Sequence, residues 1–115
     1  MVEVLKIAEN DELAEGGSKL VQLKGRTIAL FHVKNEYYAI ANFCLHRGGP
    51  LADGILDDYR VTCPWHGWKY DVRDGSFNVI PTLKVKTYPV RHREDGVFVE
   101  LPDEAPAVIS SGRVD

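Results

Sequence analysis

Apolar residues recur at every second position over many short segments of this chain, which is the pattern of half-buried β-strands. Val97, Val99 and Leu101 are spaced two apart, so within a strand they would share one face. Turn residues separate the segments. About ten short strands of this kind predict an all-β fold, a small antiparallel sandwich or barrel. The expected strands are residues 2–7, 19–23, 26–33, 37–42, 54–56, 59–62, 68–72, 76–78, 84–91 and 97–101.

The remaining segments lack a strand pattern. Residues 10–14 predict one helical turn, with Asn10 or Asp11 as its cap and two glycines after it. From residue 105 onward the chain contains Pro, Ser and Gly without periodicity. We therefore expect one folded domain over residues 1–103, followed by a flexible tail over residues 104–115.

Composition narrows the classes of partner. The chain has 115 residues, 44% of them hydrophobic, and a formal net charge of −3. An acidic balance disfavours nucleic acid and anionic membranes, because both reward a basic surface. The N-terminus lacks the basic and apolar regions of a signal peptide, and the sequence contains no apolar run near the ~18 residues of a membrane span. These features predict a soluble cytoplasmic protein.

Both cysteines of the chain belong to one motif. Cys44-x-His46 is followed by sixteen residues and then by Cys63-x-x-His66. Two thiolates and two imidazoles suit either zinc or an iron–sulfur cluster. Zinc fingers usually pair Cys with Cys and His with His, whereas here each segment carries one of each. That arrangement is the one a Rieske centre needs, with two Cys on one iron and two His on the other.

The chain resembles a Rieske iron–sulfur domain, and more narrowly the soluble Rieske ferredoxins of bacterial ring-hydroxylating oxygenase systems. The resemblance covers roughly residues 3–101, with Arg47-Gly48-Gly49-Pro50-Leu51 after the first ligand pair and Gly67-Trp68-Lys69-Tyr70-Asp71 after the second. It implies one Rieske-type [2Fe-2S] cluster held by Cys44, His46, Cys63 and His66. The two cluster-binding hairpin loops would project from one end of the fold.

The same resemblance implies a function. The protein would carry single electrons from an NAD(P)H-dependent ferredoxin reductase to a terminal oxygenase and would bind both transiently. It would not be an enzyme itself, because 115 residues leave no room for the separate mononuclear-iron domain of an oxygenase. The sequence also contains no flavin or nicotinamide motif.

Residues around the ligands are expected to tune the cluster. Gly48, Gly49 and Gly67 would let backbone N–H groups approach its sulfur atoms. High-potential Rieske proteins place a serine donor where this chain has Trp68, whereas Tyr70 stands at the position of a second hydroxyl donor. We therefore expect a reduction potential in the low part of the roughly −150 to +300 mV Rieske range.

Other residues are expected to cover or surround the cluster. Pro81 resembles the proline of the loop that covers the cluster in Rieske domains. With Leu45, Pro50 and Trp65 it would form an apolar collar at the partner-binding end, although Trp65 could instead belong to the core. Arg47 could contact an acidic partner or be solvated at the rim.

Other histidines and acidic residues of the chain are expected to lie outside the site. His32 lies inside an expected strand and His92 borders a turn, so neither is expected to be a ligand. Asp57-Asp58 predicts a solvated turn.

Two alternatives concern the whole protein. The chain could be a Rieske-type small subunit of a nitrite reductase, many of which lack the cluster ligands. It could also be a zinc-stabilised interaction module. Respiratory Rieske proteins are disfavoured because they carry a membrane anchor and an extra cysteine in each cluster loop. Here Trp65 stands where the second of those cysteines would be.

Overall fold

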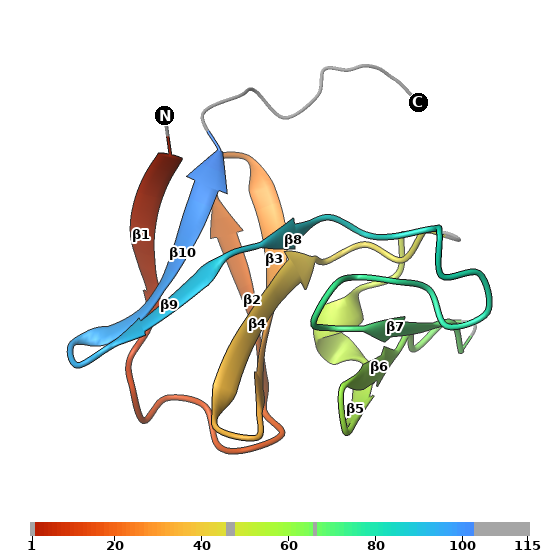
Figure 1. Ribbon diagram of the computed structural model, residues 1–115, viewed down its shortest axis with the longest axis horizontal. Helices are drawn as coiled ribbons and strands as arrows, with labels where there is room; N and C mark the ends of the chain where they lie inside the picture. Colours follow the sequence, from red (N-terminus) through yellow and green to blue (C-terminus); the bar gives the residue numbers. More distant parts are fainter. Residues whose placement is uncertain (1, 46–47, 66, 103–115) are drawn as a thin grey trace.

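The computed structural model describes residues 2–45, 48–65 and 67–102. Within these ranges the chain forms ten strands and one 3-10 turn, so the expected all-β class is confirmed (Figure 1). The first elements are β1 (Val2–Ala8), β2 (Ser18–Leu23), β3 (Arg26–Val33), β4 (Glu36–Ala41) and η1 (Leu51–Asp53). The others are β5 (Ile55–Asp57), β6 (Arg60–Thr62), β7 (Lys69–Asp71), β8 (Thr87–Tyr88), β9 (Val90–Arg93) and β10 (Gly96–Pro102).

Two antiparallel sheets form the body of the fold, in the strand orders β1-β10-β9 and β2-β3-β4-β8. The residues spaced two apart on β10, Val97, Val99 and Leu101, are buried as their spacing predicted. They pack in one core with Ile28 and Leu30 of β3. The hydrophobic pattern of β10 therefore sets which of its faces meets the other sheet.

The opposite face of β3 forms a second core. Ala29, Phe31 and Val33 are buried together with residues of a third sheet, which has the order β5-β6-β7. Strand β3 is thus buried on both faces, which explains why its sequence is almost continuously apolar. The small sheet and the loops around it make up one end of the molecule (Figure 1).

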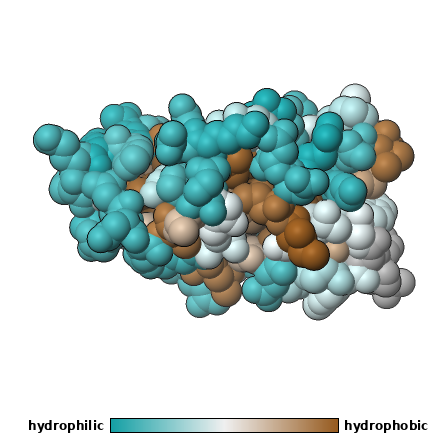
Figure 2. All heavy atoms as spheres, turned by 90° about the horizontal axis from the view of Figure 1, so that it is seen from below, coloured by the Kyte–Doolittle hydropathy of each residue, from teal (hydrophilic) through white to brown (hydrophobic). Residues whose placement is uncertain are grey.

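Most of the exposed large apolar side chains lie on the loops of this same end. Figure 2, which views the molecule from below, shows apolar atoms at the surface on its right-hand side, where Figure 1 draws the small sheet and its loops. These side chains belong to three loop segments and one edge strand: Phe43, Leu45, Ile55, Trp65, Val79, Ile80 and Leu83. A grouping of this kind marks a surface that contacts another molecule more often than scattered single residues do.

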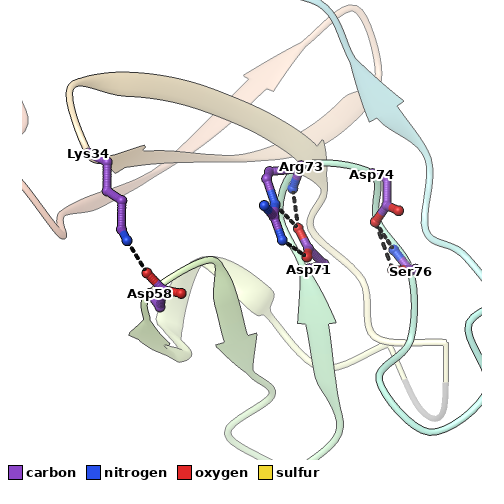
Figure 3. Close-up of polar contacts among 6 residues, drawn as sticks. All are labelled: Lys34, Asp58, Asp71, Arg73, Asp74 and Ser76. Carbon is purple, nitrogen blue, oxygen red and sulfur yellow. Dashed lines mark hydrogen bonds and ion pairs between the residues drawn. The ribbon is translucent and has the colours of Figure 1, made fainter.

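Ionic and aromatic contacts join the small sheet to the larger one. Lys34, in the β3–β4 turn, forms a 2.6 Å ion pair with Asp58 in the β5–β6 turn (Figure 3). Tyr59 lies between two cations, with its ring centroid 5.0 Å from Lys34 Nζ and 4.0 Å from Arg73 Cζ. Arg73 is itself held by Asp71 at 2.7 Å. The expected acidic turn is thus exposed, but Asp58 also has a partner.

The helical turn expected over residues 10–14 differs from the structure. Residues 10–12 form a hydrogen-bonded turn in place of a helical turn, with the N–H of Glu12 donating to the Glu9 carbonyl at 3.1 Å. Asn10 caps no helix, because its Nδ2 donates to the Glu94 carbonyl and its Oδ1 lies 2.7 Å from His92 Nε2. These contacts with the β9–β10 hairpin hold the segment in an irregular conformation.

The expected strands over residues 76–78 and 84–91 are also corrected. The first is reduced to isolated bridges, in which Phe77 pairs with Tyr70 and Ser76 with Lys84. The second is split at Pro89 into β8, which pairs with β4, and β9, which pairs with β10. Proline has no N–H to give to a ladder, so the chain changes sheets there.

The described residues include no helix long and apolar enough to cross a membrane. The tail expected from residue 104 onward lies outside the described residues.

Candidate metal centre

The two cysteines of the motif lie in loops that reach the same core. Cys44 follows β4, and Cys63 follows β6. Both are almost fully buried among the apolar residues between β3 and the small sheet, and neither is in a disulfide. His46, Arg47 and His66 lie outside the described residues, so their predicted roles remain predictions.

Each cysteine loop is closed by the same pair of backbone hydrogen bonds. The N–H of the residue four places after the cysteine donates to the cysteine carbonyl, from Gly48 to Cys44 at 2.7 Å and from Gly67 to Cys63 at 3.0 Å. The cysteine N–H in turn donates to the carbonyl five places ahead, at 2.9 Å in the first loop and 2.7 Å in the second. The two ligand-bearing segments therefore share one local conformation, although their sequences differ.

These closures require glycine and correct one prediction. Gly48 and Gly67 have φ angles of +71° and +76°, a region that side chains other than glycine rarely adopt. Their N–H groups were expected to point at cluster sulfur, but each donates to a carbonyl of its own loop. That prediction is wrong for these two residues, because the tight turn that demands glycine also uses its N–H.

Gly49 is where the two loops meet. A Cβ atom at this position would lie 2.6 Å from Cys63 Sγ and 3.2 Å from ring carbon Cδ2 of Trp65. The first loop can therefore approach the second cysteine only because Gly49 has no side chain. A cradle that brings a backbone against a buried thiol, with a second buried thiol in the same core, fits a cluster held by thiolates from both loops.

Tyr70 contacts the first cysteine directly, as expected of a hydroxyl donor. Its Oη lies 3.2 Å from Cys44 Sγ and accepts a 2.9 Å hydrogen bond from the N–H of Leu45. Because that N–H occupies the acceptor side of the oxygen, the phenol proton is free to be donated to sulfur. Burial raises the pKa of Tyr70, and the contact with Cys44 raises it further, so the phenol remains a donor at neutral pH.

Trp68 packs against an aromatic ring and has no hydroxyl to donate to sulfur. Its indole stacks on Phe77 with ring centroids 4.2 Å apart and an interplanar angle of 12°. Phe77 also contacts the Tyr70 ring, at 5.6 Å between centroids. The sequence analysis did not identify Phe77, and its isolated apolar position after a turn is the one signal that could have indicated it.

The four residues of the predicted apolar collar differ in exposure. Three of them are exposed: Trp65 to 55%, Leu45 to 46%, and Pro81. Pro50 is partly buried. The alternative that Trp65 belongs to the core is therefore wrong, since more than half of its surface is exposed, although its ring lies close to Gly49. Whether Pro81 covers a cluster stays a prediction.

Comparison with known proteins decides the family. The model of the Rieske [2Fe-2S] domain matches residues 3–89. The chain belongs to the Rieske [2Fe-2S] domain family. A curated relative from Ralstonia sp. is the ferredoxin component of naphthalene 1,2-dioxygenase/salicylate 5-hydroxylase systems. It is 38% identical over 92 residues, which cover 79% of this chain and 88% of the relative.

Solved structures confirm the Rieske fold. One chain in a complex of reduced oxygenase and oxidized ferredoxin in carbazole 1,9a-dioxygenase superposes with a TM-score of 0.77, at 26% identity. The match covers 84% of this chain and 91% of that one. A putative NADH-dependent nitrite reductase small subunit from Mycobacterium tuberculosis gives a TM-score of 0.82, covering 90% and 99%, but at 24% identity this likeness concerns the fold alone. The cofactor of this Rieske domain is a [2Fe-2S] cluster of the Rieske type.

Replacing Trp68 with serine is expected to raise the reduction potential. A hydroxyl donor to sulfur favours the more negative reduced cluster, and a hydrogen bond worth about 1.4 kcal/mol corresponds to about 60 mV for one electron. A redox titration measures the shift. Trp68→Phe is the matched control, because it keeps an aromatic ring against Phe77 and adds no hydroxyl, so its potential should stay near the wild-type value. An unchanged or lower potential in Trp68→Ser would contradict this account of tuning.

Proposed function

We propose that this protein is the ferredoxin of a multicomponent ring-hydroxylating oxygenase system. It is an electron carrier rather than an enzyme, and it passes single electrons from an NAD(P)H-dependent reductase to a terminal oxygenase. The observation that carries this proposal is the close approach of the first loop, at Gly49, to Cys63 in the core that also buries Cys44, at an end of the molecule with exposed apolar side chains. When bound, the Rieske cluster supplies a site that accepts and releases one electron.

The proposed ligands are Cys44 and Cys63 on one iron and His46 and His66 on the other. The burial of both thiols in one core and the shared closure of their loops support the cysteine pair. The positions of the histidines support the second pair, because each follows its cysteine within the five residues that the loop closure spans. Histidines on closed surface loops could present their outer ring nitrogens to a partner and shorten the path of electron transfer.

The reductase and the terminal oxygenase are both proposed to bind at the end of the molecule that carries the apolar collar. Leu45 and Trp65 expose apolar surface on the ligand-bearing loops themselves, and a docked protein would exclude water from that surface. A carrier must release one partner before it binds the next, so we expect weak and reversible contacts. The match to a ferredoxin component over 79% of this chain supports this role, whereas the nitrite reductase alternative rests on fold likeness.

The cellular location and the domain limits belong to the same proposal. We infer a cytoplasmic protein, because both cysteines belong to the proposed ligand set and neither is in a disulfide, as is usual in a reducing compartment. Residues 1–103 would form the Rieske domain, and residues 104–115 would form a flexible tail.

The deciding experiment records visible and electron paramagnetic resonance spectra of anaerobically purified protein before and after dithionite. We expect a coloured protein that is silent when oxidised and gives a rhombic signal of low average g value when reduced. Mixing the reduced protein with a ring-hydroxylating terminal oxygenase should then restore the oxidised spectrum without forming a complex that survives gel filtration. A colourless protein containing zinc would overturn the proposal, and a long-lived complex would favour the nitrite reductase alternative.

A further inference from the structure

We infer that Asn42 is a positioning residue that fixes the first ligand-bearing loop at its base. Asn42 follows β4 directly and precedes Cys44 by two residues. Among the described residues it is the one buried side chain that is neither aliphatic, aromatic nor a cysteine, with 4% of its surface exposed. A buried amide is costly unless it is hydrogen-bonded, so its partners indicate its purpose.

Those partners lie on both sides of the loop. The backbone N–H of Asn42 donates to the Thr27 carbonyl of β3 at 3.0 Å, which ties the start of the loop to the large sheet. Its side-chain Oδ1 accepts a 2.6 Å hydrogen bond from the N–H of Ala52 in η1, where the loop returns. One residue therefore joins the entry of the loop to its exit, and Cys44 lies between the two points.

The exit is held from a second direction as well. The Ala52 carbonyl accepts a 2.8 Å hydrogen bond from Ser18 Oγ of β2. The backbone N–H and carbonyl of the buried Ala52 are thus both hydrogen-bonded to side chains, the N–H to Asn42 and the carbonyl to Ser18. Because the loop would otherwise sample many conformations between its ends, two fixed ends reduce the ordering cost that cluster binding has to overcome.

The far side of the loop shows what this anchoring positions. Gly49 lies against Cys63 Sγ in the second loop, at an approach that tolerates no added Cβ. A contact this close persists only if the loop is held within a fraction of an ångström, and supporting residues serve that purpose in ligand sites. Asn42 thus acts through Ala52 on the spacing of Cys44 and Cys63, and this inference rests on the proposed cluster site.

The test compares Asn42→Ala with three other variants of the holo-protein. Cluster loss is followed as bleaching of visible absorbance during anaerobic incubation with a chelator. Asn42→Ala should bleach about tenfold faster than wild type or more, as supporting residues of metal sites typically require. Asn42→Asp should restore slow bleaching, because an Asp oxygen can accept from Ala52 in either protonation state. Ser18→Ala should have a smaller effect in the same direction. It removes the hydrogen bond to the Ala52 carbonyl but leaves the hydrogen bond from the Ala52 N–H to Asn42 intact.

Val97→Ala is the control for general destabilisation. Val97 is fully buried in the core on the other face of β3, so its truncation weakens the fold without touching the loop. It should leave both the bleaching rate and the electron paramagnetic resonance linewidth unchanged, whereas Asn42→Ala should broaden the signal as the ligand geometry becomes heterogeneous. Equal bleaching in these two variants at equal thermal stability would overturn the inference.

A measurement without the cluster separates this inference from the proposed function. In apo-protein, hydrogen exchange at the Ala52 amide should be protected in wild type and at least about tenfold faster in Asn42→Ala, with no change in Val97→Ala beyond its global effect. An unprotected Ala52 amide in wild type would overturn the role of Asn42 even if the protein carries electrons. Protection in a protein that binds no iron would instead contradict only the proposed function.

Discussion

Replacing Cys63 with alanine is expected to give a folded protein that contains no [2Fe-2S] cluster. Removing one thiolate leaves an iron with an incomplete ligand set, and the remaining residues offer no soft donor in its place. Iron and sulfide analysis, visible absorbance and electron paramagnetic resonance should all fall to background, while circular dichroism retains a β signature. Cys44→Ala should behave in the same way.

The four histidines of the chain provide a matched control for this prediction. His46→Ala and His66→Ala should also abolish the Rieske signal, because each is proposed to hold the second iron. His32→Ala and His92→Ala should retain it. Nδ1 of His32 lies 2.8 Å from the Leu13 carbonyl and its ring stacks on Tyr37, while His92 contacts Asn10, so both are engaged in the body of the fold. A full Rieske spectrum in His66→Ala, or its loss in His32→Ala, would refute the proposed ligand set.

The strands were predictable wherever a residue pattern and a local turn agree. Val97, Val99 and Leu101 define the buried face of β10 by spacing alone. Lys24-Gly25 fixes the β2–β3 hairpin, because both residues have positive φ angles that suit a tight turn between twisted strands. Local chemistry and tertiary packing point to the same structure in these segments.

The errors occur where distant contacts decide the local structure. Residues 84–91 have a continuous strand pattern, but the choice between pairing with β4 and pairing with β10 changes at Pro89. Asn10 is a residue type that often caps helices, yet its side chain forms hydrogen bonds with the β9–β10 hairpin more than eighty residues away. A pattern read along the chain contains no information about these partners.

The site divides in the same way. Cys44 and Cys63 follow from their spacing, and Tyr70 follows from resemblance to Rieske domains. Glycine at position 48 indicates an unusual backbone angle, but the sequence alone does not reveal which acceptor its N–H uses. Asn42 carries no motif, because its importance arises only when the loop returns to place Ala52 beside it.

Gly49→Ala is expected to prevent assembly of a normal cluster, with iron content falling to a small fraction of the wild-type value. The added Cβ would lie 2.6 Å from Cys63 Sγ, a separation well inside van der Waals contact. Cys63 is buried and, as a proposed iron ligand, its sulfur cannot move away without breaking the site. The first loop would therefore have to shift and carry Cys44 out of position, so iron analysis and visible absorbance of freshly reconstituted protein measure the effect.

Gly25→Ala is the matched control for this substitution, because it separates backbone strain from contact with the site. Gly25 has a φ angle of +77° in the β2–β3 turn, and a Cβ there would meet nothing within 4 Å. Its replacement costs roughly 1–2 kcal/mol of left-handed strain and should lower the unfolding midpoint with full iron content. Gly49→Ala should show the opposite, with little loss of apo-protein stability and severe loss of iron. Removing the nearby indole in Gly49→Ala/Trp65→Ala should not restore binding, since the contact with Cys63 Sγ remains. Full iron in Gly49→Ala would show that the two loops need not meet at Gly49 when the cluster binds.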